Sequence, residues 1–297
     1  MAARVGLIGL GIMGSSYAAN LLEAGFAATG FDVADAAAEA FAQRGGVRGR
    51  SAREVGAAAD VVISALASAD ALEAAFFGPG GLAESVHAGT ILVEASTFSL
   101  EVKESLRVRL AARGARVLDA PVSGTGSQAR VRDLAIYASG ERDAYEGALP
   151  VLEAIARSVR YVGAFGNGSK MKFIANLLVT IHNLSTAEAV VLAQKAGLDP
   201  AEMLEVVGDG AGSSRMLQVR GPLMVSGKYD DPGMKLDVYQ KDLEIIADFA
   251  RDVGAPTPLF SQSVLFYTAA LAQGRAKQDT AAIASVLKTM AGLPADP

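Results

Sequence analysis

The stretch RVGLIGLGIMG, residues 4–14, carries the clearest indication of the fold. Its first five residues form a short apolar run typical of a β-strand, and Gly9, Gly11 and Gly14 follow in the spacing G-x-G-x-x-G. Each glycine has its own physical role: one permits a tight turn, one lets the backbone approach a pyrophosphate, and one lets a helix pack closely on the strand. The stretch therefore predicts the first strand and turn of a dinucleotide-binding domain.

The pattern after these glycines predicts a helix from Ile12 to Ala24, which Gly25 can end. The first N–H groups of that helix, at Ile12 and Met13, would face an anion with the partial positive charge of a helix N-terminus. An ordinary glycine turn without a ligand stays open as an alternative, because a chain with 32 glycines can produce this spacing by chance.

Asp32 follows a second predicted strand, AATGF, and stands about 20 residues beyond the glycines. A carboxylate there would accept hydrogen bonds from a ribose 2'-hydroxyl and repel a 2'-phosphate. No arginine stands at the next three positions, so NAD is favoured over NADP as the cofactor. The alternative is that Asp32 only caps a helix beginning near Ala34.

Further strand candidates recur along the first half, separated mostly by helical stretches. They are residues 60–66, 90–96, 115–121, 134–140 and 159–163. Strands that alternate with helices predict an α/β fold with a doubly wound, Rossmann-like parallel sheet covered on both faces. Ligands then bind at the carboxyl ends of the strands. That rule selects Ala65 and Leu66, Ser96 and Thr97, and the segment from Pro121 to Thr125 as site candidates.

The second half predicts helices only. One uninterrupted pattern runs from Ser169 to Ala196 and ends at Gly197, and Asp199-Pro200 begins another helix as N-cap and first residue. Residues 235–253 and 257–273 are also helical in period. We therefore expect a dinucleotide-binding domain over residues 1–163 and an all-α domain for substrate binding and oligomerisation over 164–297. A long helix would join them, with the site between that helix and the carboxyl edge of the sheet.

Composition excludes several functional classes. The net charge of −5 argues against general affinity for nucleic acid or anionic lipid, and the absence of cysteine excludes disulfides, thiolate nucleophiles and Cys-based zinc sites. No metal-ligand spacing is visible, and the N-terminus resembles neither a signal peptide nor a membrane span. We expect a soluble cytoplasmic protein whose partners are small molecules and its own copies.

A nicotinamide enzyme also needs a group that exchanges a proton with the substrate oxygen. The two histidines are weak candidates, since His87 lies in a surface-like loop and His182 inside the long helix. Lysine can serve where burial lowers its pKa. In a helix, Lys170 and Lys172 point about 200° apart, and only Lys172 shares a face with Asn176, four residues on. This spacing favours Lys172 and Asn176, although two solvated lysines remain possible from spacing alone.

Five motifs in order closely resemble the β-hydroxyacid dehydrogenases, and the resemblance covers essentially the whole chain. They are GLIGLGIMG, EASTFS, DAPVSGTGS, GAFGNGSKMKFIAN and YQKDLEIIADFA. The group includes 3-hydroxyisobutyrate dehydrogenase, tartronate semialdehyde reductase and L-threonate dehydrogenase. The resemblance implies a Rossmann-like domain joined by a long helix to an all-α domain that supports dimers or tetramers.

The resemblance also implies residue roles. The general acid/base lysine of the family falls on Lys172, because Gly166 and Gly168 match the two glycines of its G-x-G-x-x-x-K motif, and the amide partner falls on Asn176. The family's carboxylate-binding serine and glycine fall on Ser123 and Gly124.

For the cofactor, the resemblance places Thr97 near the nicotinamide and Lys241 in the cofactor site. Asp242 would hold Lys241 in place or be solvated. Departures from the family pattern in the Phe98 loop and at Thr125 border the expected substrate pocket, and Ala175 replaces a usual asparagine. They bear on which substrate is taken and leave the type of reaction unchanged.

The sequence thus predicts an NAD(P)-dependent oxidoreductase acting on a small 3-hydroxyacid or the matching aldehyde acid. Two related enzyme classes stay open, oxidative decarboxylation of a β-hydroxyacid, as in 6-phosphogluconate dehydrogenases, and imine reduction. A dinucleotide-binding sensor without turnover is the alternative outside enzymes.

Overall fold

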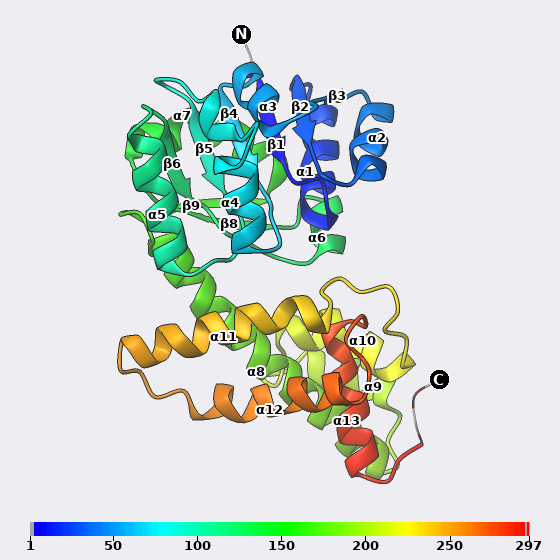
Figure 1. The fold of residues 1–297 in the computed structure, drawn as a ribbon. Helices are drawn as coiled ribbons and strands as arrows, with labels where there is room; N and C mark the ends of the chain where they lie inside the picture. The colour runs from blue at the N-terminus through cyan, green and yellow to red at the C-terminus, as the bar shows by residue number, and fades with distance from the viewer. Residues whose placement is uncertain (1–2, 295, 297) are drawn as a thin grey trace. The chain divides into compact units, whose positions relative to one another are not determined.

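The computed structural model describes residues 3–294 and 296, which form two compact units that divide between Lys172 and Phe173. The first unit holds all the strands among these residues, and the second is helical (Figure 1). The division falls inside helix α8 (Asn167–Lys195), later than the boundary after residue 163 that we expected.

A six-stranded, fully parallel sheet forms the centre of the first unit, in the order β3-β2-β1-β4-β5-β6. This is the doubly wound order of dinucleotide-binding domains, so the predicted fold class is confirmed. The strands are β1 (Val5–Ile8), β2 (Ala28–Phe31), β3 (Val47–Arg48), β4 (Val61–Ser64), β5 (Ile91–Glu94) and β6 (Arg116–Asp119).

Alternation along the strands fills a separate core on each face of this sheet. On β4, Ile63 packs into one core and Val62 into the other, as Leu7 and Ile8 do on β1. Helices cover both faces, which explains why the central strands are apolar throughout (Figure 1). The helices are α1 (Ile12–Glu23), α2 (Asp35–Gln43), α3 (Ala52–Ala58), α4 (Ala69–Phe77), the 3₁₀ turn η1 (Leu82–Glu84), α5 (Leu100–Ala111) and α7 (Arg142–Ile155).

A second, three-stranded sheet was not foreseen. Its order is β7-β8-β9, with β7 (Val122–Ser123) antiparallel to β8 (Ala135–Ala138) and β8 parallel to β9 (Ser158–Tyr161). The prediction of one parallel sheet was therefore incomplete. Strands β3 and β7 have two residues each, too few for an alternating pattern to be recognised. The short helix α6 (Gly126–Arg130) connects β7 to β8.

The helical unit contains most of α8, whose predicted span of 169–196 is confirmed. Asp199 accepts a hydrogen bond from the Ala201 N–H and caps α9 (Pro200–Gly208), as its sequence predicts. The other helices are α10 (Arg215–Ser226), α11 (Leu236–Asp252), α12 (Pro258–Ala272), the 3₁₀ turn η2 (Thr280–Ala282) and α13 (Ile283–Met290).

Helix α8 is long and apolar enough to cross a membrane, but its contacts are those of a core helix. About 44% of its most apolar window is buried inside the protein. Within the helical unit, the Thr180 hydroxyl hydrogen-bonds with the Tyr239 hydroxyl at 2.9 Å, and Asn183 Nδ2 donates to Tyr267 Oη at 3.0 Å. One face of α8 therefore places polar side chains against other helices, where each finds a partner.

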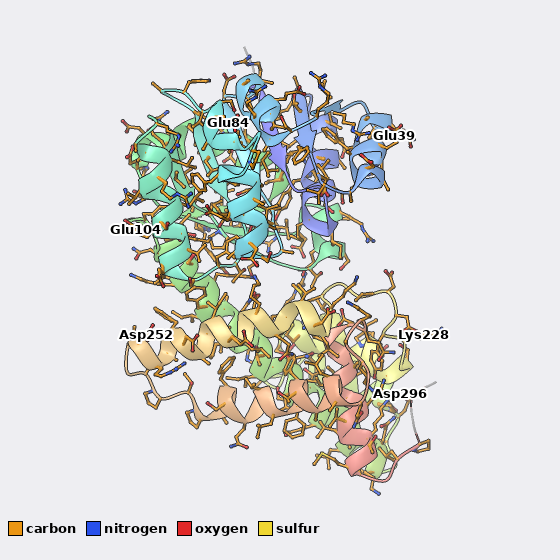
Figure 2. The ribbon with its side chains drawn as sticks, viewed as in Figure 1. Glu39, Glu84, Glu104, Lys228, Asp252 and Asp296 are labelled. Carbon is orange, nitrogen blue, oxygen red and sulfur yellow. The ribbon has the colours of Figure 1, made fainter. Side chains whose placement is uncertain are left out.

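Charged side chains mostly lie outside these cores. Figure 2 shows Glu39, Glu84 and Glu104 at the periphery of the first unit, on α2, η1 and α5. The residue before Glu104 is an exception, because Lys103 is completely buried.

Candidate active site

The three glycines after β1 differ in their surroundings as the G-x-G-x-x-G spacing predicts. Gly9 has φ +89°, and a Cβ there would lie 2.4 Å from the carbonyl oxygen of Ala65. A Cβ on Gly14 would lie 1.9 Å from the carbonyl oxygen of Gly9, whereas one on Gly11 would have no atom within 4 Å. Gly9 and Gly14 are thus required for close packing, and Gly11 leaves space beside the backbone where a pyrophosphate could approach.

Helix α1 begins at Ile12 directly after these glycines. Gly11 is the N-cap and has no side chain, so the cap supplies no acceptor to the first turn. The Ile12 side chain is 47% exposed, and Met13 packs partly against a core of the sheet. The start of α1 therefore has the features of an anion-binding helix terminus.

Asp32 lies directly after β2, and both of its carboxylate oxygens are engaged. Oδ2 accepts from the Leu10 N–H at 2.6 Å, and Oδ1 accepts from the Ala34 N–H at 2.8 Å. Helix α2 begins at Asp35 with Ala34 as its N-cap, so Asp32 does not cap that helix as the alternative interpretation supposed. The carboxylate instead ties the glycine loop to the end of the neighbouring strand, and each oxygen retains acceptor capacity.

The loops after β4 and β5 meet at the same edge. The Ala65 N–H donates to the Ile8 carbonyl, and the Leu66 N–H donates to Ser96 Oγ at 2.9 Å. Thr97, the next residue, is half-buried. These predicted cofactor contacts therefore belong to one hydrogen-bonded edge with the glycine loop.

The predicted carboxylate-binding segment lies on β7 and the turn after it. Ser123 is half-buried, and Gly124 has φ +143° with a hypothetical Cβ only 2.4 Å from Leu134 Cδ2. Thr125 caps α6 in a reciprocal capping box with Gln128. The Thr125 hydroxyl thus already has a structural function.

Phe98, in the loop that we expect beside the substrate pocket, has a buried side chain. Its side chain is 2% exposed and packs in a core of the first unit with Ile8, Leu72 and Leu106. The apolar ring contributes to sheet packing, which a motif comparison alone cannot distinguish from pocket lining.

The two lysines near the start of helix α8 differ as their spacing predicts. Lys172 is 8% exposed, whereas Lys170 is exposed and its Nζ lies 3.5 Å from Asn167 Oδ1. Asn176 is 5% exposed. Lys172 and Asn176 are therefore both buried, and their spacing of four residues places them on one face of the helix.

Asp242 was left without a firm role by the sequence, and the structure gives it contacts in the helical unit. Its Oδ2 accepts from Asn176 Nδ2 at 2.9 Å, and its Oδ1 pairs with Lys241 Nζ at 3.1 Å. Asp242 is only 5% exposed, so it holds both side chains in defined orientations. The signal in the sequence was the motif YQKDLEIIADFA, which places an acid beside the lysine.

Asp119 and Ser169 were also missed. Asp119, the last residue of β6, accepts from the Ser169 N–H at 2.7 Å and from the Ser169 hydroxyl at 2.8 Å. A Cβ on the neighbouring Gly168 would lie 2.3 Å from the Tyr137 carbonyl oxygen, which explains the glycine of the motif GNGSK. The first turn of α8 is thereby held against the ends of β6 and β8.

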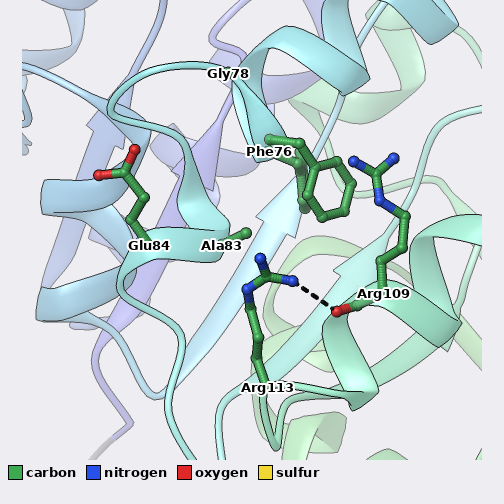
Figure 3. A pocket seen from close by; sticks show the side chains of 7 residues that line it. Phe76, Gly78, Ala83, Glu84, Arg109 and Arg113 are labelled. Atoms are coloured by element: carbon green, nitrogen blue, oxygen red, sulfur yellow. Dashed lines mark hydrogen bonds between the residues drawn. The ribbon is translucent and has the colours of Figure 1, made fainter.

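A cavity of about 340 Å³ lies elsewhere in the first unit. Phe76 and Gly78 line it from the end of α4, and Arg109 and Arg113 from the end of α5 (Figure 3). Helices that follow parallel strands run back along the sheet, so this cavity lies at the amino edge, away from the glycine loop. Within residues 3–294 and 296, acidic and histidine side chains form no group of three suited to a metal ion.

The comparisons with known proteins identify the family. Residues 4–163 match the NAD binding domain of 6-phosphogluconate dehydrogenase, and residues 166–287 match the NAD-binding domain of NADP-dependent 3-hydroxyisobutyrate dehydrogenase. The chain belongs to the β-hydroxyacid dehydrogenase family. It is an NAD(P)-dependent oxidoreductase that transfers hydride to or from small hydroxyacids.

Individual relatives align over nearly the whole chain. L-threonate dehydrogenase of Cupriavidus necator is 36% identical over 96% of both chains, and 2-(hydroxymethyl)glutarate dehydrogenase of Eubacterium barkeri is 31% identical over 98% of this chain and 96% of its own. The crystal structure of 3-hydroxyisobutyrate dehydrogenase from Salmonella typhimurium has a TM-score of 0.88 at 32% identity, covering 96% of this chain and all of that one. Imine reductases also share the fold, at identities of 21–24% with TM-scores of 0.58 to 0.63.

Alanine at Gly14 and at Gly11 should have different effects. Gly14→Ala places a methyl group against the Gly9 carbonyl, so we expect the free energy of unfolding to fall by about 1–3 kcal/mol in urea denaturation. Gly11→Ala meets no protein atom and should change stability by less than about 1 kcal/mol, yet weaken NAD binding at least about tenfold in titration calorimetry. Equal losses of cofactor affinity and stability in both variants would contradict these roles.

Proposed function

We propose that this protein is an NAD-dependent dehydrogenase of a small 3-hydroxyacid, or the reductase of the matching aldehyde acid, with Lys172 as general acid and base. The supporting observation is the polar face of α8, where Lys172 and Asn176 are both buried and Asn176 is held by Asp242. A buried amine next to an oriented amide suits proton exchange with a hydroxyl oxygen that is bound in a defined position.

The residue roles follow from their donor and acceptor groups. In the oxidation direction, the neutral Lys172 amine accepts the proton of the substrate hydroxyl, and in reduction the ammonium returns it. Asn176 donates one Nδ2 hydrogen to Asp242, which leaves its second hydrogen and its Oδ1 for the substrate oxygen. A bound nicotinamide supplies the hydride acceptor or donor, so electrons and proton balance.

The substrate carboxylate is assigned to Ser123 and Gly124, with Thr125 beside them. A serine hydroxyl and backbone N–H groups are suitable donors for a carboxylate. The names of the relatives support this class, since L-threonate, 2-(hydroxymethyl)glutarate and 3-hydroxyisobutyrate are all small carboxylates bearing a hydroxyl group.

The cofactor contacts are assigned to the glycine loop with Ile12 and Met13, to Asp32, and to the neighbouring strand ends. Ala65, Leu66 and Thr97 complete the edge, and Lys241 contributes from the helical unit. Preference for NAD rests on Asp32, whose negative charge would oppose a 2'-phosphate. Arg48, the nearby cation, is already paired with Asp35.

We also propose a homodimer or homotetramer in the cytoplasm. Leu178 and Leu192 on α8 are 46% and 70% exposed, and Leu259 and Leu265 on α12 are 66% and 59% exposed. Exposed large apolar side chains on helices of one unit are consistent with a surface that another subunit covers.

Removing the Lys172 amine tests the proposed function. We expect Lys172→Ala to lower kcat by about 10²- to 10⁴-fold with little change in NAD affinity, because the amine acts mainly in the transition state. Lys170→Ala, on the exposed side of the same turn, should keep kcat within about twofold. Reduced-nicotinamide absorbance across short 3-hydroxyacids and sugar acids gives the rates. The assignment is wrong if Lys170→Ala abolishes turnover and Lys172→Ala does not.

That substrate panel also separates the alternatives. Release of carbon dioxide in step with NADH would identify an oxidative decarboxylase, and turnover of cyclic imines alone an imine reductase. NAD binding without turnover on any substrate would identify a sensor.

Asp32 should control cofactor choice. We expect Asp32→Ser to lower kcat/KM with NAD and raise it with NADP, changing the ratio at least about tenfold. Glu39→Gln, at an exposed residue of α2, leaves the pair of Arg48 with Asp35 intact and is the control, which should shift the ratio much less. A wild-type protein that prefers NADP would overturn the argument from Asp32.

The oligomer should depend on the exposed leucines of α8. We expect light scattering after gel filtration to give a dimer or tetramer for the wild type and a smaller species for Leu178→Glu/Leu192→Glu, because buried charge is costly at an interface. Val108→Glu, at an exposed apolar residue of α5, is the control. A wild-type monomer would exclude this proposal.

A further inference from the structure

Lys103 is a buried cation in the first unit, and no role assigned so far uses it. Its Nζ lies 2.8 Å from Glu94 Oε2 and 2.7 Å from Asp119 Oδ1, and all three side chains have no exposed area. Burial disfavours the charge on Lys103, but the two carboxylates outweigh it and raise the pKa of the lysine above its usual value. Lys103 is therefore an ammonium ion at neutral pH.

One carboxylate of this cluster holds the start of helix α8. Asp119 accepts from both the N–H and the hydroxyl of Ser169, and the Ser139 hydroxyl bonds Asp119 while accepting from the Gly168 N–H at 3.0 Å. A carboxylate at a helix N-terminus is also favoured by the helix dipole. Lys172 stands three residues after Ser169, within one turn, so its backbone position depends on this anchor.

The other carboxylate holds the loops at the ends of β4 and β5. Glu94 Oε1 accepts from the Ser96 N–H at 2.9 Å, and Ser96 Oγ accepts from the Leu66 N–H at 2.9 Å. These are the loops of Ala65, Leu66 and Thr97, to which cofactor contacts are assigned. Lys103 is thus the shared partner of two acids that each fix a different part of the candidate site.

We propose that Lys103 is a positioning residue for the reaction: by neutralising Glu94 and Asp119 together, it sets the first turn of α8, and so Lys172, in register with the cofactor edge of the sheet. This inference rests on the proposed function, because only that function makes the amine of Lys172, just after the first turn of α8, a reacting group. Without the ammonium, two buried carboxylates would face each other unpaired, and either protonation or separation would change their bonds to the backbone.

The contacts that connect the cluster to α8 and to the loops after β4 and β5 can be removed separately. Ser169→Ala removes only the hydroxyl bond to Asp119, so we expect kcat to fall about three- to tenfold with the Kd for NADH unchanged. Ser96→Ala removes the bond to the Leu66 N–H, so we expect the Kd for NADH to rise by a similar factor with little change in kcat at saturating cofactor. Lys103→Met should produce both effects, with kcat reduced about ten- to a hundredfold.

Controls and a second readout distinguish positioning from loss of fold. Glu104→Gln on the outer face of α5 and Lys170→Ala on the outer face of α8 should match the wild type in both constants. Hydrogen exchange should be faster at amides 168–172 in Lys103→Met and Ser169→Ala, and unchanged in the helical unit beyond α8. If Lys103→Met does not fold, Ser169→Ala provides the test instead. Ser169→Thr, which retains the hydroxyl, should then restore kcat.

Two kinds of failure stay distinguishable. Normal kcat, normal NADH affinity and unchanged exchange at 168–172 in folded Lys103→Met would overturn the positioning role. Faster exchange at 168–172 combined with full turnover in Lys172→Ala would instead show that the anchor exists and that the catalytic assignment of Lys172 is wrong.

Discussion

The carboxylate of Asp119 joins the parallel sheet to the helix on which the candidate chemistry depends. It ends β6, pairs with Lys103, and accepts two hydrogen bonds from Ser169 in the first turn of α8. In a fully buried site, a carboxylate is stable only when cations and donors surround it, so each of these contacts constrains the others. A helix that entered at another angle would leave this charge unsatisfied.

Beyond its first turn, α8 presents buried polar side chains at helical spacing. Asn176, Thr180 and Asn183 lie on one face, and each finds a partner in the helical unit. The hydroxyl of Tyr239 also donates to the Asn176 carbonyl, and burial raises the pKa of Tyr267, which bonds Asn183, to about 12. The phenols therefore stay protonated near neutral pH and act as fixed hydrogen-bonding groups along the helix.

Sequence patterns predicted the regular elements well in two cases: where a strand is buried on both faces, and where a helical pattern extends over many residues. The apolar strands β1, β4 and β5 and the helix α8 were placed to within a few residues. Strands β3 and β7 were not predicted. They are strands because they pair with a neighbouring strand, and their residue types do not indicate it. The burial of the Phe98 side chain was not predicted either, since an aromatic residue after a strand can face a core or a pocket and only packing distinguishes the two.

The sequence by itself determined the dinucleotide-binding fold, the long helix and the placing of Lys172 and Asn176 on one face of that helix, because each follows from local rules: glycine geometry, apolar period and helical spacing. Only the tertiary structure decided that Asp242 orients Asn176 and that Lys103 joins Glu94 to Asp119. The three residues of that cluster are separated by up to 25 positions and come from two strands and a helix. Their charges can be buried only because they neutralise one another, and no local sequence pattern predicts which buried charges will come into contact.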